Sequence, residues 1–586
     1  MPEPRLWGTL DPFLESGDAL GRKAANAGFL DALLAADPFD AYHFYLASPK
    51  DRDEQAKMLG DRRPDLARRG KFRFLTRLDL PAGLRQNDYF AFHLSDCINY
   101  PAHLARLRNL VSRDIFPITS VTHSLSYAAY GRDFLLHLWP GATARDAVVA
   151  TSRAAVAAVE QFYAYLGQGY PQPGSPAAPA APVAAIAGRP RVVRLPLGVD
   201  VASFAPATDE MRRECRAELG IPQEATVFLI FARISHSSKL DPLPVFRAFQ
   251  RLAAMKRGRD GGAPPCLVMA GWTEEGGEAF ARALTDFASG IGLEFRLFPR
   301  PDEARKRRIL AASDVFLSPV DNLQETFGLS ILEAMACGLP VAASDFDGYR
   351  DLVDHGRTGL LVPTLGPADT PLLDALSPLC FDNHTHLARA QQCVVDVPQL
   401  ARALAALADD PAVRQRMGQA GRRRVEAEFS FDRVVSRYLA LWEELRREPV
   451  PDRELLRHTP HPMHIPYGRV FSGHPSALVE QDLVVTTSRA GQAVYRGQDF
   501  PVIYPALDAL IDLESLKRLL VLARNPLTVA ELAGKLRGIA ADMDGERAAF
   551  CILWALKHDL LERAGEAAML RDAGNGQAGE SDHGPS

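Results

Sequence analysis

Five short apolar runs between residues 226 and 343 constrain the fold of this chain more than any other feature. They read TVFLIF (226–231), CLVMA (266–270), EFRLF (294–298), VFLS (315–318) and VAA (341–343). Runs of this length are typical of buried strands, and helical stretches of about 10–15 residues separate them. Because parallel strands need long crossover connections, the alternation predicts a parallel sheet with helices on both faces.

The first half of the chain shows the same alternation less clearly. The strand candidates there are residues 5–10, 41–47, 71–77, 89–94, 117–122 and 148–150. A stretch rich in Pro and Ala, residues 172–188, follows, and we interpret it as a mobile surface insert. A second α/β unit begins near Arg191. The sequence therefore predicts two α/β units in succession.

The totals exclude several classes of protein. A chain of 586 residues is too long for one core, and its net charge of −5 gives no electrostatic case for nucleic acid or an anionic membrane. No segment approaches the ~20 apolar residues that span a bilayer, and the N-terminus lacks the pattern of a signal peptide. The seven cysteines are scattered singly, so neither disulfides nor a zinc knot is indicated. We expect a cytoplasmic protein with no nucleic-acid partner and no transmembrane segment.

The end of the chain departs from this pattern. Residues 450–465 are rich in Pro and His and are expected to form a linker. Short β-like runs at 478–486 and 493–496 then precede helical segments at 516–523, 529–536 and 546–561, an order that resembles a small winged-helix module. The last segment is apolar over most of its surface, which suits packing or protein contact better than DNA reading. Residues from about 572 are polar and Gly-rich, and we expect them to be disordered.

The stretch from Ser318 to Pro340 carries the strongest functional signal. Two glutamates, Glu325 and Glu333, stand on either side of Phe327-Gly328, and Glu333 lies one turn into a helix predicted to begin near Leu329. The free N–H groups at a helix start can bind a diphosphate, and a carboxylate can bind the hydroxyls of a ribose or hexose. The spacing alone is equally compatible with two solvated helix charges.

Two other strand ends carry polar residues. Arg233 and Lys239 follow the run 226–231, where two cations suit a leaving diphosphate, although surface basic residues are the commoner meaning of such a pair. His123 ends the run 116–122, and a lone histidine there is more often structural. Asp96 is a weaker candidate after the run 89–94. In open α/β sheets, ligands bind at the carboxyl ends of the strands.

The region around the two glutamates resembles the EX7E motif of retaining glycosyltransferases with the GT-B fold, of the family-4 or group 1 type. It reads ETFGLSILE from Glu325 to Glu333, after SDVFLSP (313–319) and before VAASD (341–345) and HGRTGLLVP (355–363). LGVD (197–200) matches the segment by which the chain of that family crosses between domains. The resemblance covers roughly residues 5 to 445 and is strongest from 190 to 440.

The resemblance implies an α/β, GT-B fold: two Rossmann-like domains facing a cleft, plus a small C-terminal α+β winged-helix-like module. The expected boundaries are an acceptor-side domain at 1–190, a nucleotide-sugar domain at 191–428, a closing helix at 429–449, the accessory module at 450–570 and a disordered tail at 571–586. The module loosely resembles the PqqD-like peptide-recognition fold.

Site roles follow from the resemblance where positions match. Glu325 would bind the transferred sugar and Glu333 the ribose, while the N–H groups of Phe327, Gly328 and Leu329 would line the sugar or diphosphate. Arg233 and Lys239 would hold the diphosphate, although Ala232 replaces the glycine usual before the arginine and the loop is one residue longer. His123 would reach the donor sugar from the other domain. Gly17 and Gly21 stand where the family has paired glycines near the phosphates, but here they are not adjacent.

The resemblance implies a retaining hexosyltransferase of cytoplasmic carbohydrate biosynthesis. It would move a sugar from a nucleoside-diphosphate sugar to a carbohydrate, lipid-linked or peptide hydroxyl. No cofactor is expected and no metal is required; His384, His386, His461 and His464 lack a ligand pattern. Two alternatives stay open: a GT-B scaffold that binds nucleotide sugar without transferring it, and a protein that acts through its C-terminal module on a peptide or nucleic acid.

Overall fold

The computed structural model describes residues 4–15, 21–168, 189–235, 239–256, 264–272, 278–504, 507, 509–539 and 543–564. By its contacts the chain divides into two compact units. The first comprises Met1–His43, Gly60–Phe72 and Asp88–Pro462, and the second comprises Phe44–Leu59, Arg73–Asn87 and Met463–Ser586. The predicted insert at 172–188, residue Gly17 and the predicted tail at 571–586 lie outside the described residues.

The first sheet has seven strands in the order β3-β2-β1-β4-β5-β6-β7. Its strands are β1 (Leu6–Thr9), β2 (Ala41–Leu46), β3 (Phe72–Thr76), β4 (Tyr89–Leu94), β5 (Ile118–Val121), β6 (Asp146–Ala150) and β7 (Arg191–Arg194). Its main helices are α1 (Gly21–Ala36), α2 (Pro49–Arg62), α4 (Leu80–Gln86), α5 (Pro101–Val111), α6 (Tyr130–His137) and α7 (Arg153–Gly167). The predicted strands all form, and the weakest of them, residues 5–10, supplies β1 near the middle of the sheet.

The second sheet has six strands in the order β10-β9-β8-β11-β12-β13, and every recorded pairing in it is parallel. Its strands are β8 (Thr226–Phe231), β9 (Pro265–Gly271), β10 (Glu294–Pro299), β11 (Val315–Ser318), β12 (Val341–Ser344) and β13 (Gly359–Val362). Its main helices are α8 (Asp209–Leu219), α9 (Pro242–Lys256), α10 (Glu278–Gly290), α11 (Glu303–Ala312), α12 (Leu329–Ala336), α16 (Val397–Asp409) and α17 (Pro411–Glu428). Both sheets follow the 3-2-1-4-5-6 order of Rossmann-like domains, with β7 added at the edge of the first. In this order the direction in which successive strands are added reverses between the first and fourth strands.

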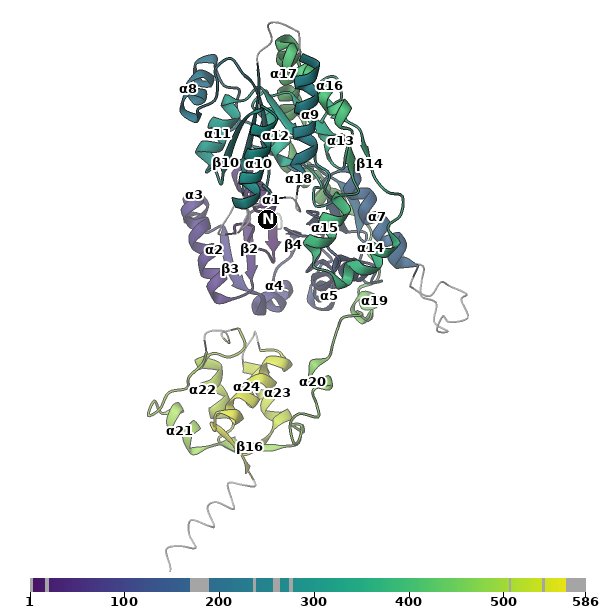
Figure 1. Ribbon diagram of the computed structural model, residues 1–586. Helices are drawn as coiled ribbons and strands as arrows, with labels where there is room; N and C mark the ends of the chain where they lie inside the picture. Colours follow the sequence, from purple (N-terminus) through teal and green to yellow (C-terminus); the bar gives the residue numbers. More distant parts are fainter. Residues whose placement is uncertain are drawn as a thin grey trace, which may run out of the picture. The chain divides into compact units, whose positions relative to one another are not determined.

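The first domain is the part of the chain built on the first sheet, and the second domain is the part built on the second sheet. Helix α18 (Phe431–Arg447) returns from the second domain to the first, where it lies near α1 in Figure 1. The Tyr438 ring packs 4.7 Å from that of Phe29, and Trp442 Nε1 donates to Thr119 Oγ1 at 2.8 Å. The chain therefore crosses between the two domains twice. The two crossing segments contact each other, since the Val199 N–H of the first donates to the Phe429 carbonyl of the second at 2.9 Å.

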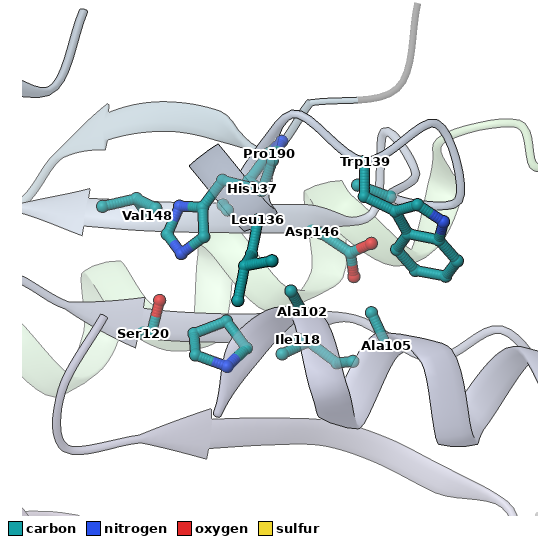
Figure 2. Close-up of a pocket in the computed structure, with 13 residues that line it drawn as sticks. Ala102, Ala105, Ile118, Ser120, Leu136, His137, Trp139, Asp146, Val148 and Pro190 are labelled. Carbon is teal, nitrogen blue, oxygen red and sulfur yellow. The ribbon is translucent and has the colours of Figure 1, made fainter. Parts of the chain in front are cut away.

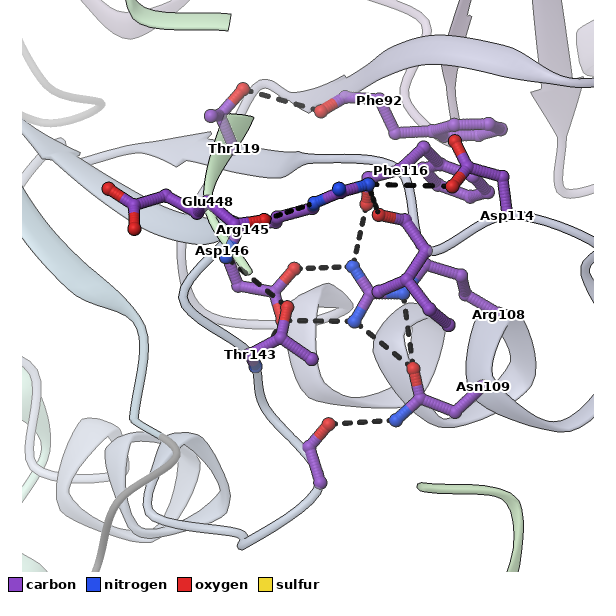
Figure 3. A network of polar contacts seen from close by, with 12 residues as sticks. Phe92, Arg108, Asn109, Asp114, Phe116, Thr119, Thr143, Arg145, Asp146 and Glu448 are labelled. Carbon is purple, nitrogen blue, oxygen red and sulfur yellow. Dashed lines mark hydrogen bonds and ion pairs between the residues drawn. The ribbon is translucent and has the colours of Figure 1, made fainter. Parts of the chain in front are cut away.

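A buried ion pair ties α5 to the edge of the first sheet opposite the cleft described below (Figure 3). Arg108 donates to both carboxylate oxygens of Asp146, at 2.5 and 3.0 Å, and to the Phe116 carbonyl at 2.7 Å. The Arg108 side chain is 0% exposed. Asp146 also accepts the Thr143 N–H at 2.8 Å. The guanidinium and the carboxylate thus satisfy each other where water is excluded.

A small cavity of about 20 Å³ lies beside this network, between Ile118, Leu136, His137 and Trp139 (Figure 2). This volume holds about one water molecule, so the cavity is too small for a substrate. The imidazole of His137 is 2% exposed, and its Nδ1 lies 2.9 Å from the Tyr163 hydroxyl. Burial lowers the pKa of His137 to about 4.

We expect His137 to make stability depend on pH. The unfolded chain binds a proton at this side chain below about pH 6.5, whereas the folded chain does so only near pH 4, so stability falls as pH drops between those values. The slope is about 1.4 kcal/mol per pH unit. His137→Asn has no imidazole to titrate, so its stability does not fall with pH for this reason. Its melting temperature should therefore lie further below that of wild type at pH 7.5 than at pH 5. A deficit that is equal at both pH values would contradict the assignment, and the paired comparison cancels the other titrating groups.

The C-terminal part contains a three-stranded antiparallel sheet in the order β17-β16-β18. Its elements are β16 (Val484–Thr487), α21 (Arg489–Tyr495), α22 (Leu513–Leu522), β17 (Leu527–Thr528), α23 (Val529–Ile539), α24 (Gly545–Lys557) and β18 (Leu561–Arg563). Helix α24 buries Ala548, Cys551, Ile552 and Trp554, in agreement with its expected role in packing.

Three local expectations for the C-terminal part are wrong. The run 493–496 is not β-like but lies at the end of α21, because Ser488 caps a helix through the Gly491 N–H. Of the run 478–486, only residues from Val484 on are in a strand. The linker contains α19 (Arg453–His458), and the Pro460 carbonyl accepts from Trp139 Nε1 at 2.6 Å, so its first half packs on the first domain. Among the described helices, none has the length and apolar character needed to cross a bilayer.

Candidate active site

A cleft of about 570 Å³ opens at the carboxyl ends of the strands of both sheets. The first domain contributes Gly21, Arg22, Ala24, Asp96, Asn99, His123, Ser124, Tyr127 and Tyr130. The second contributes Phe231, Ala232, Arg233, Lys239, Trp272, Glu303, Lys306, Gln324, Glu325, Thr326, Phe327, Gly328, Leu329, Ser330 and Glu333. The loops after β8 and β11 lie at the point where strand order reverses, which is the usual ligand position in such sheets.

Glu325 is the centre of the second domain's wall. Its side chain is 10% exposed, and its carboxylate accepts from Lys239 Nζ at 2.5 Å and from the Tyr349 hydroxyl at 3.3 Å. The N–H groups of Thr326 and Phe327 also donate to it, each at 3.3 Å. Burial by itself raises the pKa of Glu325, but the charge and hydrogen bond of Lys239 and the two N–H groups bring it below the usual value. The group is therefore an anion held next to a cation.

Helix α12 begins at the predicted residue, Leu329. Its N-cap is Gly328, at φ +102°, and no side chain caps the helix. A side chain at 328 would place its Cβ 2.4 Å from the Tyr349 ring, so both the backbone angle and the space require glycine. The uncapped helix start faces the cleft, where it can attract an anion. The Phe327 N–H, by contrast, donates to Glu325.

Glu333 has a partner that the sequence did not reveal. Lys306 Nζ donates to Glu333 Oε1 at 2.7 Å, and both side chains are 11% exposed. The ammonium also lies over the rings of Phe204 and Phe231, at 5.3 and 5.2 Å from their centroids. Burial nevertheless raises the pKa of Glu333 more than Lys306 lowers it. Lys306 stands in the run EARKRR, where nothing in the sequence separates it from its exposed basic neighbours.

Arg233 also lines the cleft, at the end of β8. Within the described part of the chain its guanidinium forms no recorded ion pair, in contrast to Lys239, which pairs with Glu325. The loop runs close to the next strand, because a Cβ at Gly271 would come 1.7 Å from the Ala232 carbonyl oxygen. The arrangement leaves Arg233 able to bind an anionic ligand in the cleft.

His123 lies on the opposite wall. Its Nε2 lies 2.9 Å from the Ser95 carbonyl oxygen, which can only accept, so Nε2 carries the proton. Burial lowers the pKa of His123 to about 4, and the ring is therefore neutral near pH 7. Nδ1 is left as an acceptor. His123 lies just after the end of β5, the position expected from the sequence.

Of the other predicted site residues, some line the cleft and one does not belong to the described part of the chain. Gly21 lines the cleft at the start of α1, and the weaker candidate Asp96 lines it as well, whereas Gly17 lies outside the described residues. Sequence reasoning missed Arg22, which pairs with Glu15 at 2.8 Å, and Tyr349. Among the described residues no group of three or more metal-binding side chains comes together. His386 has polar protein partners instead.

Comparison with known proteins gives a family match within the second domain. Residues 227–375 match the family model described as glycosyl transferases group 1. The D-inositol 3-phosphate glycosyltransferase of Kineococcus radiotolerans is 33% identical over 273 residues, which cover 45% of this chain and 53% of that protein. The enzyme of the same name from Corynebacterium kroppenstedtii is 32% identical over 197 residues, which cover 33% of this chain and 41% of that protein. The chain thus spans about half the length of the curated relatives it matches.

A large part of the chain also resembles a solved structure. A glycosyltransferase from Rickettsia africae ESF-5 superposes with a TM-score of 0.50 at 15% identity, covering 77% of this chain and all of that one. At this identity the likeness shows the fold. The chain has the GT-B arrangement of two Rossmann-like domains, and its second domain is similar to the group 1 glycosyltransferases.

Proposed function

We propose that this chain is a retaining glycosyltransferase that moves a hexose-like sugar from a nucleoside-diphosphate sugar to a hydroxyl acceptor. The observation that carries the proposal is the position of Glu325, Lys239, Arg233 and the start of α12 on one wall of the cleft, with His123 on the other. The match of residues 227–375 to the group 1 family supports the same reaction class.

The second domain offers a place for each part of such a donor. The Glu325 carboxylate would bind sugar hydroxyls, and that of Glu333 would bind the ribose diol. Arg233, Lys239 and the start of α12 would hold the diphosphate with positive charge. Because these groups supply the charge themselves, we propose that transfer requires no metal.

In the proposed reaction the bond between the anomeric carbon and the diphosphate oxygen breaks, and the electron pair leaves with the diphosphate. The acceptor oxygen attacks the same face of the sugar, and its proton passes to the departing phosphate oxygen. The configuration is therefore retained without a covalent bond to the protein. Arg233 and Lys239 would stabilise the charge that develops on the diphosphate. Neutral His123 would accept a hydrogen bond from the sugar without repelling its positive character.

The acceptor would enter along the first domain's wall, past Asp96, Tyr127 and Tyr130. A carbohydrate, lipid-linked or peptide hydroxyl fits the proposal. The C-terminal part would be an accessory module, and we propose a protein or peptide rather than nucleic acid as its partner because α24 uses its apolar side chains internally.

We expect the correct nucleotide sugar to raise the melting temperature of the chain. A ligand that binds only the folded state at 100 times its Kd stabilises it by about 2.7 kcal/mol. A thermal-shift panel of UDP-, GDP- and ADP-sugars, with and without EDTA, would identify the base and test the independence from metal. Arg233→Ala should reduce the shift for the donor. If no nucleotide sugar stabilises the chain, the proposal is wrong, and stabilisation without transfer to any acceptor would favour a scaffold that only binds.

A further inference from the structure

The segment between β13 and α16 is less regular than the rest of the second domain. It contains the short strands β14 (Thr364–Leu365) and β15 (Val394–Val395), which pair with each other, and helix α15 (Asp382–Ala390) between them. Helix α15 carries His386, whose imidazole is 0% exposed. His386 does not line the cleft, yet its hydrogen-bond partners come from loops on both cleft walls.

On one side, His386 holds the loop that follows His123. Its Nε2 lies 3.1 Å from the Ser126 carbonyl oxygen and 2.8 Å from the Ser126 hydroxyl. Its ring meets that of Tyr127 edge to face at 5.3 Å. The same helix contributes Asp382, whose Oδ1 accepts the Ala128 N–H at 3.1 Å. Helix α15 is thus fixed to three successive residues of the acceptor-side loop.

On the other side, His386 holds the loop that precedes Glu325. Its Nδ1 lies 2.7 Å from Nε2 of Gln324, the neighbour of Glu325 in the chain. Just past the helix, Gln391 Nε2 donates to Asp241 Oδ2 at 3.2 Å, beside the loop of Lys239. His386 and Gln391 therefore contact the two donor-side loops that carry the Glu325–Lys239 pair.

The partners fix the protonation of the ring. The Ser126 carbonyl oxygen can only accept, so Nε2 carries the proton, and the amide nitrogen of Gln324 can only donate, so Nδ1 is unprotonated. Both ring nitrogens are then satisfied by opposite walls of the cleft. Burial also lowers the pKa of His386, which keeps the ring neutral.

We propose that His386 is a positioning residue of the transfer reaction, which holds the His123 loop and the Gln324–Glu325 loop at a fixed separation. This inference rests on the proposed function. Its physical reason is that transfer needs donor and acceptor groups from two domains in one geometry, and small displacements are costly in rate. Loss of His386 should therefore lower kcat while the donor still binds, because no donor-binding group is removed.

The experiment uses the whole 586-residue chain with the donor that stabilises it. His386→Ala should lower kcat at least about tenfold, with KM for the donor and the thermal shift by the donor within about twofold of wild type. His384→Ala, an exposed histidine on the same helix, is the matched control and should keep wild-type kinetics. Equal kcat in His386→Ala and wild type would overturn the proposal, as would a rise in KM with kcat unchanged.

Two conservative variants separate positioning from mere packing. His386→Asn keeps an acceptor near the Nδ1 position, for Gln324, and His386→Gln keeps a donor near the Nε2 position, for Ser126. Because both walls must be held, each should stay below half of the wild-type kcat while melting closer to wild type than His386→Ala does. Full activity in either would contradict the two-sided role.

A double-mutant cycle completes the test. If Gln324 and His386 act as one unit, Gln324→Ala combined with His386→Ala should be no slower than the slower single variant. If the loss of kcat in the double variant equals the product of the two single losses, the two residues act independently, and that result would contradict the proposal. A wild-type chain that shows no turnover would refute the proposed function instead. In that case hydrogen exchange decides the inference: donor binding at Glu325 should protect residues 124–128 in wild type and not in His386→Ala.

Discussion

Replacing Glu325 by glutamine is expected to lower the rate of transfer by at least about a hundredfold, the range seen when one preorganised polar group is lost from an active site. The amide is nearly the same size but carries no charge, so it cannot pair with Lys239 or accept two hydroxyl hydrogen bonds in the same way. Initial rates with the donor found by thermal shift would measure the effect.

The fold should survive this substitution, because Glu325 lies in a loop and its carboxylate has, within the described ranges, only Lys239, Tyr349 and two N–H groups as hydrogen-bond partners. Far-UV circular dichroism and the melting curve should therefore resemble those of the wild type. Glu218→Gln, on the exposed face of α8 and paired with Arg308, is the matched control and should transfer at the wild-type rate. Full activity in Glu325→Gln would show that Glu325 is not part of the active site.

Replacing Arg108 by alanine is expected to destabilise the chain by about 3–5 kcal/mol, the usual loss when one partner of a buried ion pair is removed. The variant leaves Asp146 charged in a site where the Arg108 side chain was 0% exposed, and it leaves the Phe116 carbonyl without its donor. Thermal or urea unfolding would measure the loss. Because the network lies at the end of the sheet away from the cleft, kcat at a temperature where the variant stays folded should change little.

The control for this prediction is Arg132→Ala. Arg132 also pairs with an aspartate, Asp133, at 3.1 Å, but its side chain is 71% exposed. Exposed pairs contribute little because water screens them, so the expected change is within about 0.5 kcal/mol. Equal losses in the two variants would contradict the role of burial.

The sequence was sufficient to predict the fold and much of one cleft wall. Apolar runs marked β1 to β6 of the first sheet and β8 to β12 of the second, but not the edge strands β7 and β13. The residues after two of these runs, Lys239 and Glu325, meet because adjacent parallel strands bring their carboxyl ends to one edge. Gly328 could be placed at a turn because it precedes a helix. These inferences depend on local patterns, which a sequence displays directly.

The contacts that the sequence did not reveal come from residues far apart in the chain. Lys306 of α11 reaches Glu333 of α12 across 27 positions of the chain, and its burial against two aromatic rings is a product of packing. The link of His386 to Ser126, 260 residues earlier, follows from the arrangement of the two domains. The misassigned run 493–496 shows a competing local signal, since a serine cap outweighed its strand-like pattern.

The return of α18 has a consequence for synthesis on the ribosome. The first domain has all its strands once Arg194 has emerged, but the surface around Phe29 and His93 is covered by Tyr438, which is made much later. Synthesis proceeds at about 5–20 residues per second, so that apolar surface of the nascent first domain stays exposed to solvent for tens of seconds. The second domain is completed in this interval. A fragment that ends before Phe431 would therefore leave the first domain aggregation-prone rather than independently folded.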